Sequence, residues 1–182
     1  MKTQETQIGR RFVIFALPFA VAVVSISERA KAQSTSGDGA VYEFPNDKTV
    51  ASIRVPDAWN PNSHEDGVDG ASPDRRTFFD ISILRGADRT KELQRILLYF
   101  KDTSRHPPDL ASRTESARQI KDVATGQLTY ALGRNGVGGS LVIDFATLRN
   151  GELLIVQQWG ALGAESPNVR AMARIMATLN WK

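Results

Sequence analysis

The sequence predicts an α+β fold, in which an antiparallel β-sheet meander packs against helices. Three observations predict it. Short stretches that alternate between apolar and polar residues recur along the chain, as they do in strands that bury one face. Two other stretches repeat their apolar residues every three or four positions, as amphipathic helices do. The order is strands, a helix, further strands and a final helix, so the helices are expected to cover the apolar face of the sheet.

The first 32 residues are typical of a secretory signal peptide. Basic residues precede an apolar run from Phe12 to Ile26, and Ala30-Lys31-Ala32 fits a signal-peptidase site. The alternative is an uncleaved membrane anchor, but the run is shorter than the roughly 20 residues that a spanning helix needs. We therefore expect cleavage after Ala32, and a periplasmic or secreted protein without a stable membrane anchor.

The basic character of the whole chain belongs to this N-terminal segment. The sequence has 23 Lys and Arg and 20 Asp and Glu, of which residues 1–32 hold five and two, so residues 33–182 hold 18 of each. A balanced chain lacks the surplus positive charge that binds a phosphate backbone, so no nucleic-acid partner is expected. The chain has no cysteine, which excludes disulfides, thiolate metal sites and cysteine nucleophiles.

The remaining chain is predicted to form one domain. Residues 33–40 are polar and rich in glycine and serine, which is typical of a flexible leader. Residues 41–182 show neither an internal repeat nor a low-complexity block, and their number suits a single domain with a sizeable core.

The first predicted strand is Thr49–Val55, whose apolar residues occupy alternate positions. A second, Thr77–Arg85, is expected to pair with Gly67–Ser72 through a turn at Pro73-Asp74-Arg75. A helix follows from Arg89 to about Lys101.

Asp88 is placed to cap this helix, and His106-Pro107-Pro108 ends it. Its apolar stripe consists of Leu93, Ile96, Leu97 and Phe100. Glu115–Val123 is interpreted as a strand, although its pattern also fits a helix.

The second half of the chain predicts an antiparallel meander. Its strands are Gln127–Leu132, Ser140–Leu148 and Glu152–Gly160, with a type I′ turn expected at Asn150-Gly151. Ser166-Pro167 then fits the start of a helix, because serine is a common N-cap and proline a common first helical residue.

Three features resemble the PsbP-like α/β/α sandwich. They are the strand ending in Val55-Pro56-Asp57-Ala58-Trp59, the segment Gly67–Asp74 that leads into Phe78–Leu84, and the meander closed by a helix with a Thr-Leu-Asn-Trp tail. The superfamily includes the extrinsic PsbP subunit of photosystem II, a Ran-binding nuclear import factor and small bacterial periplasmic proteins of the DcrB type. The resemblance spans roughly residues 41–182. It implies a binding or assembly role without shared catalytic residues, so no catalytic residue is carried over.

Trp59 lies in a turn that two prolines, Pro56 and Pro61, make stiff. Such a turn can hold an indole ring in one orientation, either as a stacking platform for a ligand or as a plug at the edge of the core. Large buried aromatics dominate the core energetics of domains of this size, so we expect the plug.

The polar residues that follow suggest no metal or cofactor. Acidic residues are frequent here: Glu65, Asp66, Asp69, Asp74 and Asp80. Their spacing does not match a calcium-binding loop and favours a solvated acidic loop. His64 and His106 are expected at the surface, since two isolated histidines do not make a zinc site. The glycine-rich stretch Gly133–Gly139 lacks the Lys-Ser/Thr ending of a phosphate loop and favours a flexible hairpin tip.

These observations favour a non-enzymatic binding or accessory protein whose partner is a protein or a small molecule in the periplasm. The candidate contact residues are Trp59, Glu65, Asp66, Asp69, Arg89, Arg95 and Arg105. They would form a surface from the Trp59 turn and the Glu65–Asp74 stretch to the helix that begins at Arg89. The alternative is a hydrolase-like enzyme whose site forms only in three dimensions, around Asp57, His64 and Asp80.

Overall fold

The computed structural model describes residues 33–34, 39–45 and 48–181. The elements of the larger sheet are β4 (Asn62–His64), β5 (Gly67–Ala71), β6 (Thr77–Leu84), β7 (Pro108–Ile120), β8 (Val123–Leu132), β9 (Ser140–Thr147) and β10 (Leu153–Gly160). Those of the smaller sheet are β1 (Gln33–Ser34), β2 (Ala40–Phe44), β3 (Ala51–Val55) and β11 (Asn180–Trp181). The helices are α1 (Arg89–Thr103) and α2 (Pro167–Ala177), and the short 3-10 turns are η1 (Asp57–Trp59) and η2 (Arg134–Gly136).

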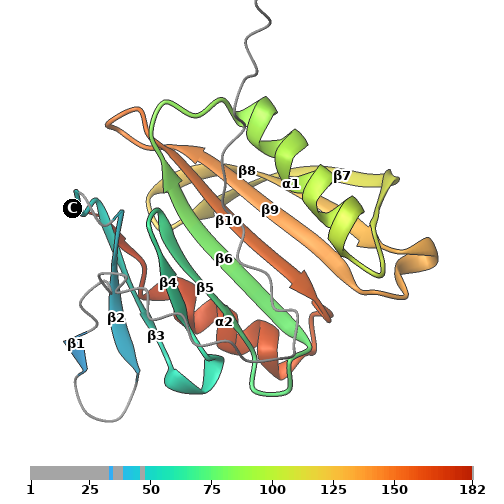
Figure 1. The fold of residues 1–182 in the computed structure, drawn as a ribbon, viewed down its shortest axis with the longest axis horizontal. Helices are drawn as coiled ribbons and strands as arrows, with labels where there is room; N and C mark the ends of the chain where they lie inside the picture. Colours follow the sequence, from blue (N-terminus) through green and yellow to red (C-terminus); the bar gives the residue numbers. More distant parts are fainter. Residues whose placement is uncertain (1–32, 35–38, 46–47, 182) are drawn as a thin grey trace, which may run out of the picture.

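The larger sheet is a seven-stranded antiparallel sheet with the strand order β4-β5-β6-β10-β9-β8-β7. Helix α1 lies on one face of it and α2 on the other (Figure 1). The smaller sheet, with the order β1-β2-β3-β11, lies on the α2 side. The predicted α+β class and its α/β/α layering are therefore confirmed.

Strand β10 runs through the middle of the large sheet and supplies both cores, because successive side chains of a strand point to opposite faces. Its Leu154 and Val156 lie in the core on the α2 side. Its Leu153 and Ile155 lie in the core under α1. The nearly continuous apolar run of this strand is thus explained by burial on both faces.

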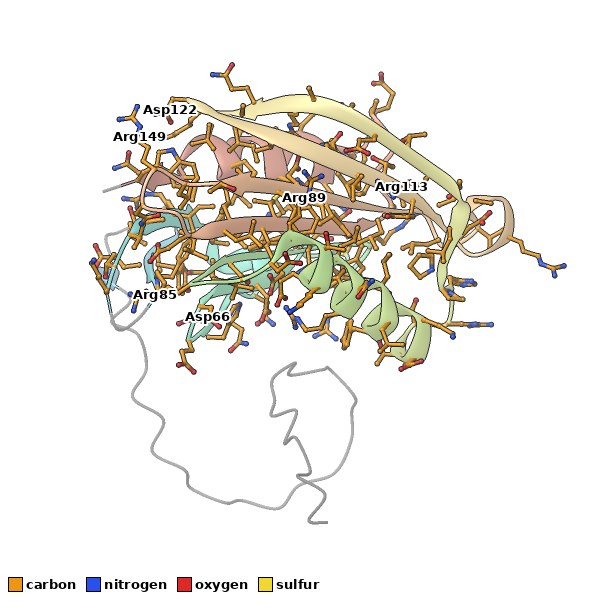
Figure 2. The ribbon with its side chains drawn as sticks, turned by 90° about the horizontal axis from the view of Figure 1, so that it is seen from above. Asp66, Arg85, Arg89, Arg113, Asp122 and Arg149 are labelled. Carbon is orange, nitrogen blue, oxygen red and sulfur yellow. The ribbon has the colours of Figure 1, made fainter. Side chains whose placement is uncertain are left out.

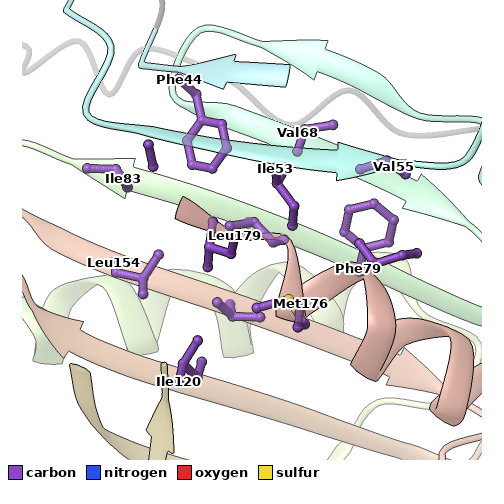
Figure 3. Close-up of a cluster of buried hydrophobic side chains, with 14 of the residues drawn as sticks. Phe44, Ile53, Val55, Val68, Phe79, Ile83, Ile120, Leu154, Met176 and Leu179 are labelled. Carbon is purple, nitrogen blue, oxygen red and sulfur yellow. The ribbon is translucent and has the colours of Figure 1, made fainter. Parts of the chain in front are cut away.

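The first core lies between the large sheet, α2 and the smaller sheet (Figure 3). Its labelled side chains in Figure 3 are Phe44, Ile53, Val55, Val68, Phe79, Ile83, Ile120, Leu154, Met176 and Leu179. Helix α2 contributes Met172, Ile175 and Met176, which recur at helical spacing. The sheet strands contribute alternate residues, so three elements that are distant in sequence share one apolar layer.

The second core lies under α1, whose Ile96 and Phe100 are buried against the meander. The sheet residues beneath them are Leu128, Tyr130, Leu132, Leu141, Ile143, Phe145, Leu153 and Ile155. Asp88 caps the helix as predicted, since its side chain accepts a hydrogen bond of 2.9 Å from the backbone N–H of Lys91. Ser166 is the N-cap of α2, but its backbone carbonyl, rather than its side chain, accepts from the N–H groups of Val169 and Arg170.

Several boundaries differ from the sequence prediction. The uncertain segment Glu115–Val123 is a strand, but it belongs to the longer β7 and turns at residues 121–122. The smaller sheet was not predicted as a sheet: β2 begins at Ala40, and β11 pairs with β3 through Asn180 opposite Ser52. The predicted signal segment 1–32, and residues 35–38 of the predicted leader, lie outside the described residues.

The turn between β9 and β10 is not the predicted type I′ turn. A type I′ turn needs a positive φ at both central residues, and here Gly151, with a φ of 82°, is in the left-handed region whereas Asn150 is not. The N–H of Gly151 donates to the carbonyl of Leu148 at 2.9 Å, so Arg149 and Asn150 are the central residues. The connection is a three-residue loop in which glycine follows the turn as a bulge.

In the part of the chain that the structure describes, neither α-helix has the length and apolar character needed to cross a membrane.

Candidate functional site

Trp59 is a core residue. Only 4% of it is exposed, and its ring packs against that of Phe79 with 5.9 Å between the centroids. The turn η1 directs the ring toward the core, and in this turn the backbone N–H of Trp59 donates to the backbone carbonyl of Pro56 at 2.9 Å. The plug predicted from the sequence is what the structure contains, and burial removes Trp59 from the candidate contact residues.

The acidic stretch Glu65–Asp74 is not one loop. Glu65 and Asp66 form the turn between β4 and β5, whereas Asp74 lies beyond the other end of β5 and accepts from the Asn168 amide of α2 at 2.9 Å. Glu65 and Asp66 line an open cleft of about 450 Å³ at the start of α1, together with Arg85. Asp66 and Arg85 lie on the same side of the molecule in Figure 2.

The candidate arginines do not form a single basic face. Arg89 reaches the sheet, where its guanidinium lies 5.3 Å from the centre of the Phe145 ring and 3.6 Å from Glu115 (Figure 2). Gly126 makes room for it, because a Cβ there would come within 2.9 Å of the Arg89 Nη2. Arg95 pairs with Glu92 at 2.6 Å, and Arg105 is exposed in the loop after α1. Arg89 therefore connects the start of α1 to the sheet through its contacts with Phe145 and Glu115.

One group of chemically active side chains lies on the α1 side of β4, β5 and β6. We call His64, Asp69 and Asp80 the His–Asp cluster. The Nε2 of His64 is 3.3 Å from Oδ2 of Asp80, and one potential ligand atom from each of the three residues lies within 4.8 Å of the others. Asp57, the third residue of the predicted enzyme site, is exposed in η1 and takes no part in the cluster.

Neutral side chains hold the carboxylates of the His–Asp cluster. The Ser82 hydroxyl donates to Oδ1 of Asp80 at 2.7 Å, and the Gln157 amide donates to the same oxygen at 3.3 Å. The Asn62 amide donates to Oδ2 of Asp69 at 3.2 Å. Each carboxylate therefore has one oxygen tied to these donors and a second oxygen outside these bonds.

The cluster also shifts its members' pKa values. Burial alone lowers the pKa of His64, but the hydrogen bond and charge of Asp80, with the charges of Asp69 and Asp66, outweigh it and raise that pKa. Burial raises the pKa of Asp69, and the neighbouring charge of Asp80 adds to the rise. The negative charge of Asp80 thus raises both pKa values, whereas burial lowers the pKa of His64 and raises that of Asp69.

Sequence reasoning grouped His64 and Asp80 in the alternative enzyme site but did not place Asp69 with them, because the three residues come from three strands and have no common spacing. The hairpin predicted from the sequence already implied that Asp69 and Asp80 would be close. A hairpin closed by Ser72 and Thr77 puts Asp69 directly opposite Asp80, and the N–H of Ser72 does donate to the carbonyl of Thr77 at 2.8 Å. The missing piece was β4, which the sequence did not predict and which brings His64 to the same face.

A second feature, which we call the aromatic cleft, lies beside the C-terminal end of α1. It measures about 550 Å³, and its side-chain lining includes Arg76, Phe78, Ser104, His106 and Trp159. The rings of Phe78 and Trp159 stack with 5.5 Å between their centroids, and Phe100 meets Trp159 edge-on at 5.4 Å. The lining residues, all of them in the described chain, include no carboxylate.

The glycine-rich connection between β8 and β9 forms one wall of the aromatic cleft. A Cβ on Gly139 would lie 1.9 Å from the carbonyl oxygen of Gly160, and one on Gly138 would lie 2.5 Å from Cβ of His106. The stretch does join two strands of a hairpin, as predicted, but close packing requires Gly138 beside the His106 ring and Gly139 beside the Gly160 backbone.

Comparisons with known proteins agree with this architecture. No family model matches the sequence, and no curated protein matches it. Among solved structures, the chain is similar to the solution structure of cyanobacterial PsbP (CyanoP) from Synechocystis sp. PCC 6803, with a TM-score of 0.53 and 14% sequence identity. The similarity covers 84% of this chain and 98% of that one. The fold of this protein is therefore PsbP-like, an α+β sandwich of the kind that the sequence resemblance implied.

Proposed function

We propose that the protein is exported to the periplasm or beyond the cell, and that it works as a non-enzymatic binding or accessory protein. The observation that carries the proposal is the aromatic cleft. Its volume is in the range of ligand sites, and it combines stacked rings with a few polar groups, which is the usual composition of such sites.

The chemistry of the aromatic cleft fits a particular kind of guest. The Phe78 and Trp159 rings offer an apolar surface, and Arg76 and His106 offer donors beside it. An apolar or aromatic group with an anionic substituent would use both. Either a small molecule or a side chain of a partner protein can carry such a group.

The hydrogen bonds of the nearby serines do not favour a serine-hydrolase mechanism. In the aromatic cleft, the Ser104 hydroxyl donates to the backbone carbonyl of His106 at 3.0 Å rather than to an imidazole. In the His–Asp cluster, Ser82 donates to Asp80. A catalytic triad needs the serine to donate to the histidine, and neither serine does so. The PsbP-like fold supports a binding role as an argument by analogy.

Affinity capture from periplasmic extract tests the proposal. Wild-type protein is compared with Arg76→Glu, which reverses charge in the aromatic cleft, and with Arg149→Glu, which makes the same change in the exposed turn before β10. We expect a specific partner that is retained by wild type and by Arg149→Glu and is lost by Arg76→Glu.

Two outcomes would contradict the proposal. One is capture that Arg76→Glu leaves unchanged. The other is reproducible turnover in an esterase, phosphatase and peptidase screen that disappears in Asp80→Ala while the variant stays folded, which would favour the enzyme built on the His–Asp cluster.

A further inference from the structure

We infer that His64, Asp69 and Asp80 form a binding site for one divalent transition-metal ion, with an imidazole nitrogen and two carboxylates as its protein ligands. The inference is independent of the proposed partner in the aromatic cleft, because none of these three residues lines that cleft. It is supported by geometry, by charge and by the bonds that orient the ligands.

The geometry of the His–Asp cluster is that of ligands around one ion. Ligands about 2.0–2.2 Å from a common ion lie roughly 3–3.5 Å apart when they are neighbours. The Nε2 of His64 and Oδ2 of Asp80 are 3.3 Å apart. The Asp69 carboxylate completes a triangle whose potential ligand atoms all lie within 4.8 Å, so a small side-chain rotation brings the three to one ion.

The charge of the cluster calls for a cation. Asp69 and Asp80 are directly opposite each other on β5 and β6, and like charges in that relation destabilise a sheet. Among the described residues, neither carboxylate has an Arg or Lys in an ion pair; apart from His64, their side-chain donors are the neutral groups of Asn62, Ser82 and Gln157. A divalent ion bound between the two carboxylates would offset their repulsion.

The surrounding bonds orient the ligands. Ser82 and Gln157 bind Oδ1 of Asp80, while its Oδ2 faces His64. Asn62 binds one oxygen of Asp69 and leaves the other outside that bond. Outer donors of this kind fix the direction of metal-binding carboxylates, and their loss typically lowers metal affinity about 10–100-fold.

The donor set selects the type of ion. Ca²⁺ and Mg²⁺ prefer oxygen ligands alone, whereas an imidazole with carboxylates suits Zn²⁺ and its first-row neighbours. The His64 and Asp80 side chains are 31% and 15% exposed, so an ion can reach them from solvent and water can fill the remaining coordination positions.

Titration of the purified protein with Zn²⁺ tests the inference, with Ca²⁺ titrated in parallel. Wild type is compared with Asp69→Asn and His64→Gln, each of which removes one ligand, and with the control Asp102→Asn, an isosteric change of an exposed aspartate on α1. We expect one Zn²⁺ per chain. The ligand variants should bind at least about 100-fold more weakly, the upper end of the range for losing an outer-shell partner. The control should bind as wild type does.

Thermal unfolding without and with Zn²⁺ separates metal binding from a purely structural role. Without metal, Asp69→Asn should be at least as stable as wild type, because it removes a facing carboxylate. With metal, wild type and Asp102→Asn should gain stability and the ligand variants should not. The inference fails if Zn²⁺ binds Asp69→Asn and His64→Gln as tightly as wild type, or if Ca²⁺ binds more tightly than Zn²⁺.

Discussion

At the scale of single residues, Trp59 shows why a large aromatic is found in a turn. Two prolines fix the backbone around it, and the 3-10 turn η1 directs the indole against Phe79 on β6. The residue belongs to the first core and lies in the connection that leads from β3 of the smaller sheet to β4 of the larger one. Its contribution is therefore to stability.

We expect Trp59→Ala to lower the free energy of unfolding by about 3–5 kcal/mol, the range for deleting a large aromatic from a core. The control is Leu98→Ala on α1, where the side chain is 57% exposed and the change should stay within about 0.5 kcal/mol. Urea denaturation of both variants measures the difference. A loss below about 1 kcal/mol for Trp59→Ala would mean that the indole is a surface residue.

Some residue-scale features have no signal in the sequence. Asp144 interrupts the apolar run of β9, and alternation alone places it on the α2 side of the sheet. Its partners come from the two preceding strands: Thr125 and Gln127 donate to Oδ1, and Arg118 lies 3.6 Å from Oδ2. Burial raises the pKa of this carboxyl. Only the register of three strands reveals these contacts.

At the scale of elements, long and strongly patterned segments were predicted well. Helix α1 and strands β6, β9 and β10 have clear periodicity over many residues, so packing and local preference agree there. The elements that were missed are short. β1, β2, β4 and β11 have two, five, three and two residues, and they are strands because tertiary pairing supplies the hydrogen bonds that their own pattern does not predict.

The two glycine turns give a matched test of close packing. Gly139 and Gly151 both have a positive φ, but a Cβ at 139 meets the Gly160 carbonyl at 1.9 Å whereas one at 151 meets nothing within 4 Å. We expect Gly151→Ala to cost about 1–2 kcal/mol, from backbone strain alone. Gly139→Ala should cost roughly 1–3 kcal/mol more, because the neighbouring strand must move.

Denaturant unfolding of the two alanine variants checks this expectation, and the aromatic cleft gives a second readout since Gly139 lines it. Capture of a partner should fall in Gly139→Ala and stay unchanged in Gly151→Ala. Equal stability of the two variants would contradict this expectation, because it would show that the backbone around Gly139 can move aside at no cost in free energy.

At the scale of the whole molecule, the sequence predicted the class of fold and not the sites. The two helices, the meander and the resemblance to the PsbP-like sandwich led to the right architecture, because each rests on many residues. The candidate contact surface rested on single charged residues. The structure divides that surface into a core plug at Trp59, an Arg89 whose guanidinium contacts Phe145 on the sheet, and an acidic turn at Glu65 and Asp66.

Export is a property of the whole chain. We expect the mature protein to begin at Gln33, because Ala30 and Ala32 have the small side chains that signal peptidase accepts. N-terminal sequencing of the periplasmic fraction measures this. Ala32→Arg should block processing and leave the chain in the membrane fraction, whereas wild type recovered there at full length would show that residues 1–32 act as an anchor.

The pairing of β11 with β3 determines when the smaller sheet can finish folding. β3 lies in the first third of the chain and β11 at residues 180–181, and Leu179 beside β11 is fully buried in the first core. Contacts between such distant segments form only when both segments are free to meet. In the export that we propose, a chain that crosses a membrane N-terminus first keeps its smaller sheet unclosed until residues 180–181 have emerged.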